Sequence, residues 1–105
     1  MSGRPFDASY DESTSTLTLT GIVDELSLDD MKAALATASE ELTVPVRVDL
    51  SEVDFLPSIG LGILAAAMRR CRARGGEVTL VTRSGTLAAR VLEISGLPFD
   101  LSGAA

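Results

Sequence analysis

The sequence contains no histidine, no tryptophan and only one cysteine, Cys71. The absence of histidine excludes a Ser-His-Asp triad, a histidine-activated cysteine and a histidine-ligated metal. A single cysteine excludes an intrachain disulfide and a cysteine-pair metal site, as is usual in a reducing compartment. We therefore expect a cytoplasmic protein that is not an enzyme, with no catalytic residues, no bound metal and no cofactor.

Aromatic residues, basic residues and long apolar runs are also scarce. Four aromatic residues among 105 leave a mostly aliphatic core. Nine basic against fifteen acidic residues give a formal net charge of -6, which argues against a nucleic-acid partner. The longest apolar run, residues 59–68, has about half the length that a membrane span needs, and the N-terminus lacks the apolar segment of a signal peptide. We expect one domain over residues 1–105 that does not bind a membrane.

The residues that remain alternate between strand and helix patterns. Strands are predicted at 6–11, 16–23, 44–50, 77–82 and 99–102, and helices at 28–42, 59–74 and 86–95. Ser27 and Ser84 are the predicted N-caps of the first and third helices, and Gly75 and Gly96 stand where helices end. Because the strands alternate apolar and polar residues, one face of the sheet is solvated and the helices gather on the other. The class is α/β, with parallel pairing through crossovers.

The segment VDFLPSIGLGIL, residues 53–64, admits three interpretations. Residues 60–65 match the G-x-G-x-x-A pattern of a dinucleotide site, although residues 51–59 separate them from the strand. A structural interpretation makes Ser58 a helix N-cap, with Gly60 and Gly62 letting the first turn approach a neighbour. In the third interpretation, the first turn of the helix is apolar, with Ile59 and Leu61, and forms a surface that binds a partner protein. A phosphate on Ser58 would then meet the free N–H groups of the helix and repel a docked partner.

Three other features have structural explanations. The arginines at 69, 70, 72 and 74 lie in the last turns of a helix, where cations offset its dipole. Cys71 continues the apolar stripe of that helix, which favours burial. The acids Asp49, Glu52 and Asp54 lack the glycine turn of a calcium loop, and solvated positions account for them.

The phrases LTLTGIVD, VRVDLSEVDFLPSIGLGIL, RRCRARGGEVTLV and VLEISGL resemble the STAS domain family of bacterial anti-sigma factor antagonists. The resemblance covers nearly the whole chain. It implies a STAS-like single layer of mixed β-sheet, of about four or five strands, with helices packed mainly on one face. It also implies a partner-switching regulator of transcription. The antagonist binds an anti-sigma factor, often a serine kinase, releases a sigma factor, and is ejected when phosphorylated.

The resemblance also assigns site residues. The family motif Asp-Ser-Ser-Gly-Leu-Gly is here Pro57-Ser58-Ile59-Gly60-Leu61-Gly62, so an isoleucine stands at the usual acceptor position. In the stressosome type the acceptor directly follows the motif Asp, which is the place of Ser58. Gly21 and Asp24 match the G-x-x-D loop beside the switch helix. The implied partner-binding residues are Gly21, Asp24, Pro57, Ser58, Ile59, Gly60 and Leu61.

Two alternatives to a phosphorylated antagonist stay open at this point. One is a constitutive or stressosome-like scaffold without a phospho-switch, which assembles with other STAS proteins or with itself. The other is a nucleotide-binding domain that uses the amino end of the second helix.

Overall fold

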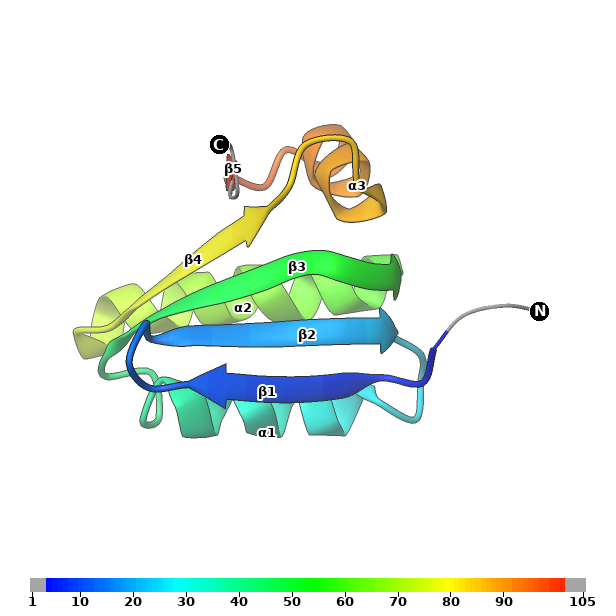
Figure 1. The fold of residues 1–105 in the computed structure, drawn as a ribbon. Coiled ribbons are helices and arrows are strands. Elements are labelled where there is room, and N and C mark those ends of the chain that lie inside the picture. The colour runs from blue at the N-terminus through cyan, green and yellow to red at the C-terminus, as the bar shows by residue number, and fades with distance from the viewer. Residues whose placement is uncertain (1–3, 102–105) are drawn as a thin grey trace.

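A computed structural model describes residues 4–101 of the chain, which form one five-stranded sheet and three helices (Figure 1). The elements follow in the order β1 Asp7–Asp11, β2 Thr16–Ile22, α1 Leu28–Ala38, β3 Pro45–Phe55, α2 Ser58–Arg74, β4 Glu77–Thr82, α3 Leu87–Ser95 and β5 Asp100–Leu101. The strands lie in sequence order across the sheet. β1 and β2 are antiparallel and every later pair is parallel, so the sheet is mixed. The fifth predicted strand includes Ser102, which lies outside the described residues.

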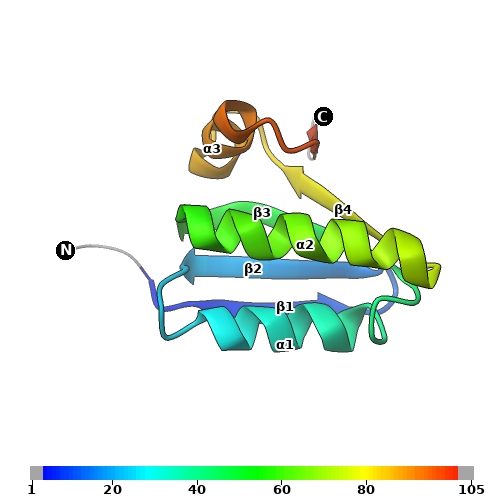
Figure 2. The same ribbon diagram turned by 180° about the vertical axis from the view of Figure 1, so that it is seen from behind.

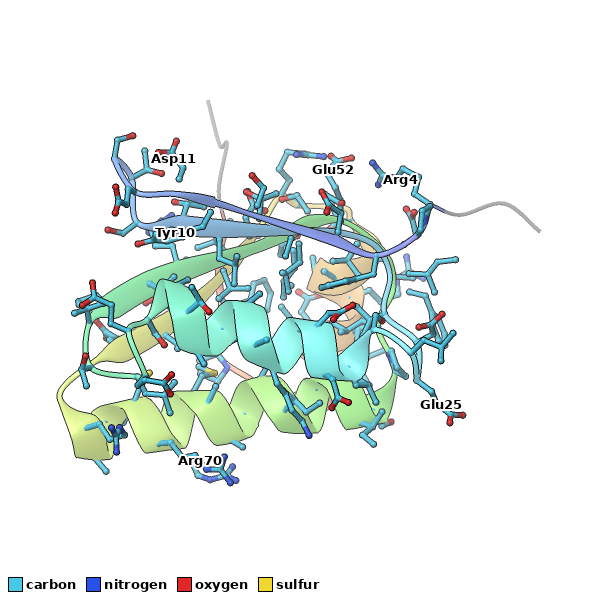
Figure 3. The ribbon with its side chains drawn as sticks, turned by 90° about the horizontal axis from the view of Figure 1, so that it is seen from below. Arg4, Tyr10, Asp11, Glu25, Glu52 and Arg70 are labelled. Atoms are coloured by element: carbon cyan, nitrogen blue, oxygen red, sulfur yellow. The ribbon has the colours of Figure 1, made fainter. Side chains whose placement is uncertain are left out.

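The helices lie on one side of the sheet, as the one-sided strands predict. Figure 2 shows α1 and α2 running side by side over the back of the sheet, and Figure 3 shows the sheet edge-on above them. The core lies between these layers and is almost wholly aliphatic. Its largest fully buried side chains are Leu17, Leu19, Met31, Leu50, Leu64, Leu80 and Leu92.

The first helix is shorter than predicted, because it ends at Ala38 and not at Leu42. The buried Ser39 hydroxyl donates to the carbonyl of Leu35 at 2.6 Å and accepts the N–H of Leu42 at 3.0 Å, which turns the chain away from the helix axis. Glu40, Glu41 and Leu42 then all have left-handed φ angles, of 50°, 62° and 70°. The left-handed conformation costs a non-glycine residue about 1–2 kcal/mol, so this turn stores strain.

The predicted position of one serine N-cap is confirmed and that of the other is wrong. Ser27 occupies the N-cap position of α1, but its hydroxyl bonds to Asp24 and makes no capping hydrogen bond. The third helix begins at Leu87, one residue after its predicted start at Thr86. Its N-cap is Thr86 and not Ser84, because the Thr86 hydroxyl accepts the N–H of Ala89 at 3.1 Å. The predicted glycine ends are confirmed: Gly75 and Gly96 take left-handed conformations directly after α2 and α3.

Candidate partner-binding site at the amino end of α2

The carboxyl ends of β2 and β3 and the amino ends of α1 and α2 lie at one end of the molecule (Figure 1). β3 continues to Phe55, well beyond its predicted end at Leu50, so that only Leu56 and Pro57 connect it to α2. The N–H of Val23 donates to the carbonyl of Phe55 at 3.0 Å. This bond holds the β2–α1 loop, which contains Asp24, against the start of α2. The fold thus brings the two predicted parts of the site together.

Ser58 is the first residue of α2 and is exposed to solvent. The predicted N-cap role is wrong, because Pro57 occupies the cap position and no side chain caps this helix. Within residues 4–101, the Ser58 hydroxyl makes no hydrogen bond to another side chain or to the backbone. The first backbone bond of the helix runs from the N–H of Leu61 to the carbonyl of Pro57 at 3.1 Å. The preceding N–H groups therefore remain available to an anion.

The loop at Asp24 is closed by hydrogen bonds to Ser27. The N–H of Asp24 donates to the Ser27 hydroxyl at 2.8 Å, and the N–H of Ser27 donates to Asp24 Oδ1 at 3.1 Å. Ser27 is buried while Asp24 is exposed. The second carboxylate oxygen, Oδ2, has no hydrogen bond to any described residue. Asp24 therefore both shapes its loop and presents an oxygen to solvent.

Two of the predicted partner-binding glycines are buried and position the site through the backbone. Gly21 has φ +85°, and a Cβ there would overlap the carbonyl oxygen of Pro5. A Cβ on Gly60 would lie 3.2 Å from Leu56 Cδ1 and 3.4 Å from Val23 Cγ1, so α2 packs closely against the β2–α1 loop at this point. Gly60 thus fulfils the expected close approach, whereas Gly62 does not, because a Cβ there would have nothing within 4 Å.

Large apolar side chains are exposed around this end of the molecule. Leu26, Phe55 and Ile59 are 89%, 51% and 59% exposed, whereas Leu61 is partly buried against the core. We call Leu26, Phe55 and Ile59 together the apolar rim. Sequence reasoning included Ile59 in the site but missed Leu26 and Phe55. The sequence did contain a signal for both residues, because Leu26 is an apolar residue within the polar turn DELS and Phe55 is an aromatic residue directly after the acidic Asp54.

Three ion pairs border this end on the solvated face of the sheet. Arg4 pairs with Asp54 at 3.3 Å and with the Glu52 carboxylate at 3.5 Å, and its guanidinium also donates to the carbonyl of Glu52 at 2.6 Å. Arg83, after β4, pairs with the side chain of Glu52. Hydrogen bonds from Arg4 lower the pKa of Asp54, and those from Arg83 lower the pKa of Glu52. These acids are therefore partners of arginines, which the sequence analysis did not anticipate.

The remaining candidates behave as structural residues. Cys71 is buried, and desolvation raises the pKa of its thiol, which makes it unreactive. Arg69, Arg70, Arg72 and Arg74 are exposed. Over the part of the chain that the structure describes, no cluster of metal-ligating side chains forms and no helix is both long and apolar enough to cross a membrane.

The argument against the dinucleotide interpretation rested partly on a wrong strand boundary. β3 ends at Phe55, so the glycines follow the strand more closely than predicted. They nevertheless lie inside α2 and not in the strand–helix turn, where a pyrophosphate would approach. The space beside Gly60 is taken by Leu56 and Val23, which leaves no room there for a ligand.

Comparison with known proteins adds independent information. The family model described as Mlab, STAS domain matches residues 6–98. An anti-sigma-B factor antagonist of Listeria monocytogenes is 34% identical over 77 residues, which cover 73% of this chain and 67% of that protein. The anti-sigma-F factor antagonist RsfA of Mycobacterium tuberculosis is 38% identical over 65 residues, covering 62% of this chain but only 48% of RsfA.

Solved structures share the fold at lower identity. An anti-sigma factor antagonist from Mycobacterium paratuberculosis superposes with a TM-score of 0.75 at 24% identity, over 92% of this chain and 85% of that one. The Bacillus cell fate determinant SpoIIAA in its phosphorylated form gives 0.64 at 22% identity, over 91% of this chain and 88% of that one. The α/β architecture expected from the sequence, a mixed sheet with helices mainly on one face, is confirmed.

Proposed function

We propose that this chain, which belongs to the STAS domain family of anti-sigma factor antagonists, binds an anti-sigma factor through the apolar rim, Asp24 and the start of α2. Antagonists of this family are regulators and not enzymes. In this proposal the chain acts in the cytoplasm and frees a sigma factor by occupying the anti-sigma factor. The relatives named above support the class of partner, because each is described as an antagonist of an anti-sigma factor.

The observation that carries the proposal is the apolar rim. Soluble domains bury large aliphatic and aromatic side chains where they can, and burying one contributes about 1.5–3 kcal/mol. Here Leu26, Phe55 and Ile59 are all exposed at the end where the matching family motif lies. Exposed apolar side chains with a polar border are typical of protein interfaces, where a few such residues supply most of the binding free energy. The exposed carboxylates of Asp24 and Glu25 favour a basic partner surface.

Phosphorylation of Ser58 would provide the switch. Its exposed hydroxyl is accessible to a kinase. A phosphate there would carry about two negative charges beside the free N–H groups of α2, which would stabilise it. The same charges would lie next to Ile59 and Phe55 and would oppose their burial against a partner. The modified protein would therefore remain folded while it loses its partner.

A constitutive antagonist is the second candidate, and Ile59 is the observation that favours it. An isoleucine cannot accept a phosphate, and its exposed side chain gives the interface an apolar contact at the position that the resemblance to the family motif assigns to the usual acceptor. Such a protein would bind its partner without a switch. Assembly with further STAS domains, or with itself, would use the same apolar rim.

A two-hybrid assay against the anti-sigma factors encoded by the source organism tests the proposal. We expect one of them to bind the wild type and to lose at least about tenfold in affinity with Ile59→Lys, because a charge replaces a central apolar contact. Ile94→Lys is the matched control, since Ile94 is 80% exposed on α3 and is not part of the apolar rim. Equal binding by both variants would exclude the apolar rim as the interface.

Peptide mass spectrometry of the protein isolated from its host separates the two candidates. Phosphate on Ser58 supports the switch, and Ser58→Ala should then keep the partner bound under all conditions. Complete coverage of this peptide without phosphate, across growth and stress, supports the constitutive antagonist.

A further inference from the structure

A groove lies between α1 and α2. Figure 3 shows these two helices side by side below the sheet. Its volume is about 550 Å³, which lies within the range of small-molecule sites, about 300–1,000 Å³. Most of its lining is aliphatic, and its charged members are few. The lining residues are Lys32, Leu35, Ala36, Glu41, Leu42, Ile59, Gly62, Ile63, Ala66, Ala67 and Arg70.

The α2 side of the groove is one continuous helical face. Ile59, Gly62, Ile63, Ala66 and Arg70 recur at intervals of one, three or four residues and span roughly 16 Å along the axis at 1.5 Å per residue. The small residues Gly62 and Ala66 leave space in the middle of this face, and Ile59 and Ile63 lie next to them. The groove is therefore long and mostly apolar, with room in its centre.

The strained turn after α1 forms the wall of the groove near Arg70. Leu42 and Glu41, both in the left-handed conformation, line the groove there. The turn is held in place by Glu41, whose N–H donates to the carbonyl of Ala36 at 2.8 Å and whose carbonyl accepts from Arg74 Nε at 2.8 Å. Backbone strain that the surroundings enforce is concentrated at ligand clamps and switch regions. Here it fixes Leu42 at the groove.

The charge around the groove is opposite in sign to that of the chain. The chain has a formal net charge of -6, yet Lys32 and Arg70 line the groove and Glu41 is the one acid among its lining residues. A smaller hollow of about 470 Å³ adjoins the groove at Arg70 and is also lined by Arg74. Within residues 4–101, neither Lys32 nor Arg70 pairs with a carboxylate. An occupant with an apolar body and an anionic end would complement this arrangement.

We propose that the groove binds a single-chain anionic amphiphile of the fatty-acid type. The acyl chain lies along α2 over Gly62 and Ala66, between the isoleucines and Leu42, and the carboxylate pairs with Arg70 where the two hollows meet. This site shares Ile59 with the apolar rim, but the proposal does not depend on the function proposed above. A peptide helix would also present an apolar face, but the finite length of the groove and its adjoining cationic hollow favour a small molecule with one charged end.

Isothermal titration with sodium dodecanoate, below its critical micelle concentration, tests this site on the full chain. We expect saturable binding of one molecule per chain, with the amide resonances of Gly62 and Ala66 shifting in parallel. Gly62→Leu should abolish binding by filling the groove, and it should fold, because a Cβ at this position meets nothing within 4 Å. Arg70→Gln should weaken binding about tenfold by removing a charge-assisted contact. Arg90→Gln, on the exposed side of α3, is the matched control and should bind as the wild type does.

Several outcomes would overturn the proposal. Absence of saturable binding would do so, as would unchanged binding by Gly62→Leu. Equal affinity for dodecyltrimethylammonium would show that the cations play no part. Two outcomes would identify the groove as a protein interface when dodecanoate does not bind. In the first, Gly62→Leu has a different oligomeric state from the wild type; in the second, Gly62→Leu no longer binds the anti-sigma factor. Ile59→Lys changes both the apolar rim and the groove lining, whereas Gly62→Leu and Arg70→Gln change the groove alone. Dodecanoate binding by these two variants therefore tests this site without the anti-sigma factor, so the two proposals fail separately.

Discussion

Gly62 and Gly60 differ by two positions in α2, and we expect their replacement by alanine to have opposite effects on stability. Glycine in a helix interior is about 1 kcal/mol less favourable than alanine, because its backbone loses more conformational freedom on folding. A Cβ at Gly62 would have nothing within 4 Å. Gly62→Ala should therefore add about 1 kcal/mol to the free energy of unfolding, which raises Tm by about 4–8 °C in a domain of this size.

Gly60→Ala is the matched comparison. Its Cβ would lie 3.2 Å from Leu56 Cδ1 and 3.4 Å from Val23 Cγ1, both in the buried core. The Leu56 methyl group can shift, but the β-branched valine has little rotamer freedom, so overpacking of about 1–2 kcal/mol should exceed the small helix gain in the first turn. We thus expect Gly60→Ala to lower the free energy of unfolding.

Urea unfolding followed by far-UV circular dichroism measures both changes, and the slope m should stay constant. The reasoning fails if Gly62→Ala destabilises the protein or if the two variants shift the midpoint equally. Destabilisation by Gly62→Ala would mean that the space around Gly62 is not open, and equal shifts would mean that α2 does not lie against the β2–α1 loop at Gly60 as the structure places it.

Three further predictions concern the ends of the strands and the start of α2. Because Arg4 lowers the pKa of Asp54 from its ordinary 3.8, this carboxylate stabilises the fold above that value, and its contribution is lost as the pH falls through the lowered pKa; the difference in Tm between wild type and Asp54→Asn should be small, positive at about pH 6, and absent near about pH 2. Gly21→Ala should cost more than about 2 kcal/mol in the same urea assay, because a left-handed alanine is strained and its Cβ overlaps the carbonyl of Pro5; near-neutral behaviour would contradict this. Ser58→Asp should raise stability by about 0.3–1 kcal/mol through the helix dipole yet weaken anti-sigma binding, and parallel loss of both in calorimetry and binding assays would refute the switch geometry.

The periodicity of apolar residues was sufficient to predict that the helices cover one face of the sheet, since this arrangement follows from the local pattern of each strand and helix. The alternation in residues 44–50 identified the buried face of β3, and the stripe of α1 identified Met31 and Leu35 as core residues. The ends of α2 and α3 at Gly75 and Gly96 were also predictable from local sequence, because a left-handed glycine directly after a helix needs no distant partner.

The errors arose where a distant or competing partner decides the outcome. Ser27 is a good N-cap by composition, but Asp24 offers its hydroxyl alternative bonds within the loop. The end of α1 depends on a hydrogen bond of the buried Ser39, which no periodicity reveals. The continuation of β3 past Leu50 depends on pairing with β2, where a register shift lets Leu50 and Ser51 both be buried.

The site also has features that the sequence predicts and features that only the folded structure reveals. The resemblance to the STAS family predicted that Asp24 and Ser58 lie close together, but the apolar rim became visible only through exposure, which depends on how the whole chain packs. Ile59 belongs both to the apolar rim and to the lining of the groove between α1 and α2. An occupant of the groove and a protein at the rim would therefore contact the same side chain. If both proposals hold, the two ligands must influence each other, and by linkage the groove ligand changes the affinity for the partner by the same factor by which the partner changes the affinity for the groove ligand. The position where Ile59 replaces the usual phosphoacceptor would then still carry regulation, through occupancy of the groove instead of phosphate.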